Sequence, residues 1–153
     1  MIFATVDPKI AASLALVESS GNQWALRFEP AMHARGAWAD HVDIIARIVS
    51  ANHCSIATAQ VIFCTSFGRY QIMGGNLYSR CMLHASVGEY MASPDFQDQT
   101  LSAFLGALGF NGTAADLVSD PQRLRAFALF YNGPGNVADY SARLLTAIRM
   151  TAQ

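Results

Sequence analysis

Three segments of the sequence combine polar and glycine residues at the ends of apolar stretches, where side chains able to do chemistry are expected. They are LALVESSGN (14–22), TSFGRYQIMG (65–74) and AFALFYNGPGN (126–136). Glu18 falls near the C-terminus of an expected apolar helix, in phase with Leu14. Burial and the negative end of the helix dipole both favour a protonated carboxyl, so both raise its pKa. Such an acid can donate a proton to a glycosidic oxygen; the alternative is a solvated glutamate at a frayed helix end.

The other two segments offer neutral polar groups beside tight turns. Gln71 carries both a donor and an acceptor, and Gly68 and Gly74 let the backbone around it turn sharply. Tyr131 and Asn132 precede Gly-Pro-Gly, so a phenol and an amide are expected at a rigid helix end. Taken separately, each segment is equally consistent with a structural turn or a helix stop.

Taken together, the order of the three segments resembles a known motif set. ESSGN, then GRYQIM about fifty residues later, then FYNGPGN about sixty beyond that, is similar to the motifs of goose-type lysozymes and soluble lytic transglycosylases. The chain resembles still more closely the N-acetylmuramidase family of phage endolysins, in which an ESSGN-like start precedes a Phe-Glu segment and a Ser-x-Gly-Arg-x-Gln-Ile-Met-Gly loop. Here these are Phe28-Glu29 and residues 66–74, and the resemblance covers residues 10 to 148.

This resemblance implies a mostly α, lysozyme-like domain with a substrate cleft, in which Glu18 is the catalytic proton donor. It implies substrate-binding or supporting roles near the scissile sugar for a further set of residues, namely Ser19, Ser66, Gln71, Tyr131 and Asn132.

Glu29 is the candidate for a second catalytic carboxylate. Its alternative is an ion pair with Arg27, Arg35 or Arg69. A separation from Glu18 of about 6.5 to 9.5 Å would admit a water and predict inversion, whereas about 5 Å would favour a covalent, retaining path. Without a second carboxylate, the sugar's own N-acetyl or 6-hydroxyl group would attack, as in lytic transglycosylases.

Helix signals divide nearly the whole chain. Asp7-Pro8, Ser93-Pro94 and Asp120-Pro121 each supply an N-cap followed by proline at the first helical position, and Ser86 with Glu89 reads as a capping box. Further helices are expected around Val42, Ile45, Ala46 and Val49, from Ser55 to Phe63, and from Val137 to Ile148. Only 25–28 and 65–70 look extended, which predicts a mostly α fold with at most a small β-hairpin.

Composition limits the remaining classes of function. The 153 residues are 52% hydrophobic and only 14% charged, which excludes disorder and fits one domain, taken as residues 1–153 without a separate wall-binding domain. Charged residues interrupt every apolar stretch, so stable membrane insertion is not expected. The net charge of -1 gives no footprint for nucleic acid. The histidines and the three cysteines, Cys54, Cys64 and Cys81, show no metal-ligand spacing, so neither a metal nor another cofactor is expected, and the cysteines are expected to be free.

The sequence therefore predicts a monomeric muramidase acting on peptidoglycan glycan strands. No signal peptide is recognised at the N-terminus, so synthesis in the bacterial cytoplasm is expected, with access to the wall through a holin or as part of a virion. A lytic transglycosylase forming anhydromuramic products is one alternative. A noncatalytic peptidoglycan-binding or tail structural protein on the same fold is the other.

Overall fold

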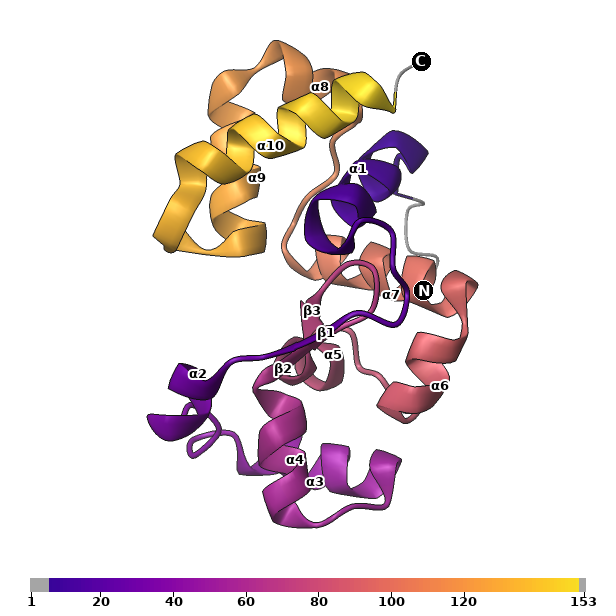
Figure 1. Cartoon of the computed structure of the whole chain (residues 1–153), viewed down its shortest axis with the longest axis vertical. Coiled ribbons are helices and arrows are strands. Elements are labelled where there is room, and N and C mark those ends of the chain that lie inside the picture. Colours follow the sequence, from indigo (N-terminus) through magenta and orange to yellow (C-terminus); the bar gives the residue numbers. More distant parts are fainter. Residues whose placement is uncertain (1–5, 152–153) are drawn as a thin grey trace.

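The computed structural model describes residues 6–151, and over that range the chain is mostly helical (Figure 1). The helices are α1 (Pro8–Ser19), α2 (Pro30–Ala34), α3 (Val42–Asn52), α4 (Ile56–Phe63), α5 (Gly74–Ser79), α6 (Val87–Ala92), α7 (Pro94–Ala107), α8 (Ala114–Ser119), α9 (Pro121–Asn132) and α10 (Val137–Met150), with a short 3-10 helix at Pro134–Asn136. The strands are β1 (Leu26–Phe28), β2 (Thr65–Phe67) and β3 (Ile72–Met73). The predicted mostly α, lysozyme-like class is confirmed.

Capping side chains set the beginnings of the helices at the predicted positions. The Asp7 carboxylate accepts from the Lys9 backbone N–H at 2.8 Å, and the Asp120 carboxylate accepts from the backbone of Gln122 and Arg123. Ser86 and Glu89 form the expected reciprocal capping box. These bonds satisfy N–H groups that have no partner within a helix.

The helices form two groups with the sheet between them. α1 packs on α10, which also packs on α8 and α9, and Figure 1 shows these four helices together at one end of the molecule. α3, α4 and α5 pack on one another at the other end, near the sheet. Glu18 and the sheet strands thus belong to adjoining parts of the fold, because α1 ends where the chain turns toward β1.

The sheet is antiparallel in the order β1-β2-β3. β1 pairs with β2 in the register Arg27 to Ser66, and β2 pairs with β3 in the register Ser66 to Met73. The two extended pieces expected from the sequence pair antiparallel, but α2, α3 and α4 separate them in the chain, and the hairpin is formed by β2 and the two-residue β3. It forms because the chain reverses at residues 68–71 and returns along β2.

One predicted helix face differs from the structure. In α3, Ile44, Ile45 and Ile48 are buried, whereas Val42 is 74% exposed. The predicted stripe was therefore offset by part of a turn, since Val42 and Ala46 lie on the solvent side of the buried isoleucines.

Two findings bear on possible ligands and membranes. Across residues 6–151, no group of three or more His, Cys, Asp or Glu side chains is arranged to hold a metal ion. None of the helices in that range is long and apolar enough to cross a lipid bilayer.

The three cysteines are free thiols, with Cys64 buried and the other two partly buried.

Candidate active site

The structure brings the three sequence segments together around the loop Gly68–Gln71. The Ser19 hydroxyl, at the end of α1, donates to the Arg69 carbonyl at 2.8 Å. The Tyr131 hydroxyl, at the end of α9, donates to the Tyr70 carbonyl at 2.8 Å. Segments far apart in the sequence are thus fastened to one loop by side chains that the sequence had singled out.

Glu18 lies in the last turn of α1, partly buried beside α10. The Tyr140 hydroxyl donates to Glu18 Oε1 at 2.5 Å, and the Tyr140 ring stacks on the Tyr131 ring with centroids 6.3 Å apart. The acid is therefore in contact with α10 directly and with α9 through two stacked tyrosines.

Burial is the main influence on the carboxyl group of Glu18. Desolvation raises its pKa above the usual 4.5, while the Tyr140 hydrogen bond and the charges of Arg27 and Arg143 partly lower it. Burial and the nearby Glu18 also raise the pKa of Tyr140, so this phenol stays protonated and acts as a donor. Because Tyr140 donates to Oε1, the acidic proton of the neutral carboxyl group belongs on Oε2. A carboxyl group with a raised pKa keeps its proton to higher pH than an ordinary glutamate, which is what donation of a proton requires.

Arg143 also fixes the end of the helix that carries the acid. Its guanidinium donates to the Val17 carbonyl at 2.8 Å. A cation at a helix C-terminus is favourable because it neutralises the negative end of the helix dipole. This contact packs α10 against the last turn of α1, where Glu18 lies.

Glu29 follows β1 and forms an ion pair with Arg27. Arg27 Nε lies 2.7 Å from Glu29 Oε1, and the Glu29 side chain is 33% exposed. Since Arg27 also influences the pKa of Glu18, its charge lies near both carboxyl groups. Among the described residues Glu29 Oε2 has no hydrogen-bond partner, so this oxygen is free to accept a proton or a water.

The loop Gly68–Gln71 owes its shape to Gln71. This residue has a positive φ of 48°, a region unusual for a side chain other than glycine. Its side-chain amide donates to the carbonyls of Ala25 at 3.1 Å and Gly68 at 2.9 Å, which holds the turn closed. Gln71 therefore positions the loop with its donor group, and its amide oxygen remains as an acceptor.

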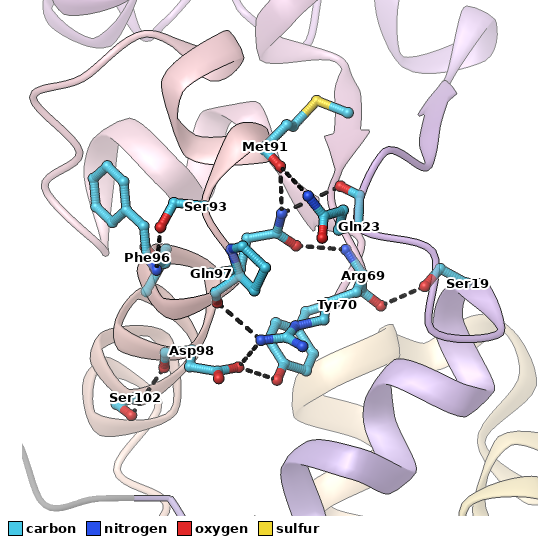
Figure 2. A network of polar contacts seen from close by, with 12 residues as sticks. Ser19, Gln23, Arg69, Tyr70, Met91, Ser93, Phe96, Gln97, Asp98 and Ser102 are labelled. Carbon is cyan, nitrogen blue, oxygen red and sulfur yellow. Dashed lines mark hydrogen bonds and ion pairs between the residues drawn. The ribbon is translucent and has the colours of Figure 1, made fainter.

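A second network fastens the loop from α7 (Figure 2). The fully buried Gln97 accepts from the Arg69 backbone N–H at 2.8 Å and donates to the carbonyls of Gln23 and Met91. Gly68 leaves room for it, because a Cβ there would lie 2.5 Å from Gln97 Oε1.

The Asp98 carboxylate lies on the neighbouring position of the same helix. It accepts from the Arg69 guanidinium at 2.5 Å and from the Tyr70 hydroxyl, as Figure 2 shows. The side chains of residues 69 and 70 are consequently fixed by α7, while their carbonyls accept from Ser19 and Tyr131.

The remaining predicted residues lie in different surroundings. Ser66 is buried in β2, and its hydroxyl contacts the Met73 sulfur at 3.1 Å. Asn132 ends α9 and is exposed, with no side-chain hydrogen bond among the described residues. The structure thus gathers Ser19, Gln71 and Tyr131 near the Gly68–Gln71 loop, leaves Asn132 open to solvent and encloses Ser66 in the sheet.

Sequence reasoning did not identify Tyr140 or Gln97 as site residues. Tyr140 fell within the helix expected from Val137 to Ile148 and was given no role of its own. A tyrosine on a buried helix face needs a partner for its hydroxyl, and that requirement was the available signal. Gln97 carried no signal, since one glutamine in a helix gives no indication that three backbone groups from other segments converge on it.

Comparison with known proteins shows what the whole chain is similar to. The family model described as N-acetylmuramidase matches residues 18–151. An endolysin of Enterobacteria phage PRD1 is 40% identical over 131 residues, which cover 82% of this chain and 87% of that protein. No solved structure matches the chain.

Proposed function

The chain belongs to the N-acetylmuramidase family, and from this premise we propose that it hydrolyses the β-1,4 bond between N-acetylmuramic acid and N-acetylglucosamine in peptidoglycan, with Glu18 as general acid. The observation that carries the proposal is the surroundings of Glu18. Burial raises the pKa of this carboxyl group, and the Tyr140 hydroxyl donates a hydrogen bond to its Oε1. The proton on Oε2 is transferred to the glycosidic oxygen as the C–O bond breaks.

The charges near Glu18 fit the second half of this proton transfer. Once the proton has left, Glu18 is an anion in a partly buried position, which is unfavourable without compensation. The Tyr140 hydrogen bond and the charges of Arg27 and Arg143 all favour that anion, because each lowers its pKa. The same groups therefore limit how far burial raises the pKa and stabilise the carboxylate after transfer.

Glu29 is the second carboxylate of this proposal. Arg27 holds Glu29 Oε1, and Oε2 accepts a proton from the attacking water. The developing positive charge on the sugar is then matched by two carboxylates, as in most glycosidases. Ser19, Gln71 and Tyr131 shape the loop beside the scissile bond. The exposed Asn132 amide is free to contact the sugar, and Ser66 supports the sheet from within.

The biological role follows from the similarity to an endolysin. We propose that this chain likewise degrades the wall of a phage-infected bacterium, either released from the cytoplasm through a holin or carried in the virion. In this proposal residues 1–153 form one catalytic domain, of which residues 18–151 match the family model, and the domain acts as a monomer. The molar mass measured by light scattering of the purified protein tests whether it is a monomer.

The decisive experiment compares wild type with Glu18→Gln on purified peptidoglycan. We expect wild type to release muropeptides and Glu18→Gln to lose about 10²- to 10⁴-fold in rate. Glu89→Gln is the matched control, because Glu89 lies in the capping box of α6 and glutamine can replace glutamate there. If wild type and Glu18→Gln are equally active, or neither is active, the chain is not an enzyme of this mechanism.

Mass spectrometry of the products separates the enzymatic alternatives. Hydrolysis adds water and leaves a reducing sugar, whereas a lytic transglycosylase leaves an anhydromuramic end. Borohydride reduction before analysis identifies the reducing sugar, and muramitol is the expected product. Glucosaminitol would contradict the proposed bond, and anhydro ends would contradict hydrolysis.

A further inference from the structure

The outer edge of β1 carries backbone groups that no other part of the described chain uses. β1 is an edge strand, because the order of the sheet is β1-β2-β3. The Gly68 N–H donates to the Ala25 carbonyl and the Glu29 N–H donates to the Cys64 carbonyl, so bonding to β2 occurs at alternate positions. Leu26 and Phe28 are the positions between, and in an antiparallel pair their N–H and C=O groups point away from β2.

The side chains at this edge are apolar and open to solvent. Trp24, Leu26 and Phe28 follow one another with the period of a strand and are 56%, 63% and 39% exposed. Within residues 6–151, no hydrogen bond from a turn, cap or side chain reaches the backbone of Leu26 or Phe28. Soluble proteins usually block such edges, because an open edge pairs readily with another extended chain.

Two cations lie at this strand. Arg27 is on the same strand. The loop Gly68–Gln71 bonds both to Ala25, directly before this strand, and to Ser19, the neighbour of Glu18, so β1 begins close to the proposed acid. Arg35 is exposed, and no ion pair engages it in the part of the chain that the structure describes. Arg35 caps the end of α2, the five-residue helix that begins directly after Glu29, so it lies one short helix beyond the end of β1. Burial raises the pKa of the Cys64 thiol, the charge of Arg35 lowers it in part, and the Cys64 carbonyl accepts from Glu29.

We propose that the free edge of β1 binds the peptide stem of peptidoglycan as a short added strand. The inference rests on the proposed function, because the stem is attached to the N-acetylmuramic acid beside the scissile bond. Three strand residues span about 10 Å, enough for about three residues of an extended peptide. The outward amides of Leu26 and Phe28 pair with the stem backbone, and Arg35 faces a stem carboxylate. The edge thereby selects glycan that carries peptide.

The kinetic test uses two variants at one position. Leu26→Pro removes the outward N–H without removing a bond between β1 and β2, and proline is tolerated in edge strands for that reason. Leu26→Ala keeps the N–H and removes the side chain. For each, kcat and KM are measured on intact peptidoglycan and on the same glycan after an amidase has removed the stems.

We expect wild type to have the lower KM on intact peptidoglycan, and Leu26→Pro to reduce that preference about three- to tenfold. Leu26→Ala should keep most of it, as should Ile56→Ala, which alters an exposed apolar residue on α4. A wild type without preference for stems overturns the proposal. An equal loss on both substrates also overturns it and assigns the edge to the N-acetyl groups of the glycan.

A binding measurement keeps the test valid if Leu26→Pro fails to fold or the protein proves noncatalytic. A free tripeptide stem is titrated into ¹⁵N-labelled Glu18→Gln protein. The amide signals of Leu26 and Phe28 are expected to shift more than that of Arg27, whose N–H faces β2. No shift, or shifts only at Arg27, overturns the proposal. Shifts that follow protein concentration without peptide would show pairing with a second copy and overturn it as well.

Discussion

The Tyr140 hydroxyl donates a 2.5 Å hydrogen bond to Glu18 Oε1 across 122 positions of sequence. It joins the last turn of α1 to the first turn of α10, and these helices pack along one another. The bond favours the ionised carboxylate, in opposition to the burial that favours the acid. The pKa of Glu18 is therefore set by two opposed effects, burial and the Tyr140 hydrogen bond. A mutation can change either one without the other.

Tyr140→Phe removes the contribution that lowers the Glu18 pKa. The pKa should rise, so the decline of kcat/KM at high pH should move to higher pH, because a general acid acts only while protonated. We expect kcat at the optimum to fall about tenfold, since Oε1 is no longer held. Rates on peptidoglycan from pH 4 to 9 provide the measurement. Tyr78→Phe is the control, because it also removes a hydroxyl, one that bonds to Asn52 and Ala85 and not to Glu18. A shift of the pH profile toward lower pH in Tyr140→Phe would contradict the prediction.

Glu18→Gln should stabilise the folded protein at neutral pH but hardly at pH 4. The folded pKa of Glu18 is raised above 4.5, so the folded state binds the proton more tightly than the unfolded state. Stability is then greatest below the ordinary pKa and is lost as pH rises through the folded pKa. Melting temperatures at pH 4 and pH 8 test the sign. An equal change at both values, or a loss at pH 8, would be inconsistent with a carboxyl group whose pKa is raised by burial.

Glu29→Gln should lower kcat about 10²-fold with little change in melting temperature, because the side chain is partly exposed. Azide supplied in solution should restore turnover and yield a glycosyl azide of inverted configuration, since a small nucleophile needs no base. Asp40→Asn, at an exposed carboxylate, is the matched control. Retained activity in Glu29→Gln would remove Glu29 from the mechanism and favour attack by the sugar itself.

Gln97→Met should lower the free energy of unfolding by about 3 kcal/mol or more. The substitution keeps the approximate volume but leaves the Arg69 N–H and the Gln23 carbonyl without their partner in the interior, and the Met91 carbonyl keeps only its bond from the Gln23 side chain. Gln99→Met, at an exposed position of α7, should change it by less than about 0.5 kcal/mol. Urea unfolding measures both. Equal effects would mean that the buried amide contributes nothing specific.

Gly74→Ala should destabilise the fold by about 3 kcal/mol, because the added Cβ would overlap the backbone carbonyl oxygen of Ile62. Gly88→Ala is its control. The nearest atom to a Cβ at Gly88 is 3.8 Å away, and alanine favours a helix, so a gain of up to about 1 kcal/mol is expected. The same urea experiment applies, and a Gly74→Ala protein as stable as wild type would show that α4 and α5 can move apart without a large loss of stability.

The sequence predicted the features of the fold that depend on local chemistry. Asp7, Ser86 and Asp120 begin helices because their side chains accept from N–H groups two or three residues ahead, and such bonds are visible in a short window. The six-residue helix α5 and the strand β3 were not predicted. They begin in a segment of glycines and isoleucine whose conformation depends on packing against Ile62 and Phe63.

The candidate site likewise contains residues that the sequence predicted and residues that it did not. Glu18 could be predicted from its place at a helix end, and Gln71 and Tyr131 from the order of the segments. Tyr140 could not, because its partner lies on another helix, and the choice between a carboxylate and its ion pair at Glu29 depended on the position of Arg27. Contacts between distant elements decide such assignments, and periodicity does not encode them.

The hydrogen bonds from Ser19 and Tyr131 to the Gly68–Gln71 loop end on main-chain carbonyls. Any amino acid supplies a carbonyl, whereas only certain side chains supply the hydroxyl. Mutational tolerance should therefore be unequal at the two ends of each bond, with positions 19 and 131 restricted. The side chains of Arg69 and Tyr70 are held instead by Asp98 on α7, so an engineer who alters residues 69 and 70 would have to redesign position 98 with them, while the two hydroxyls keep the loop in place.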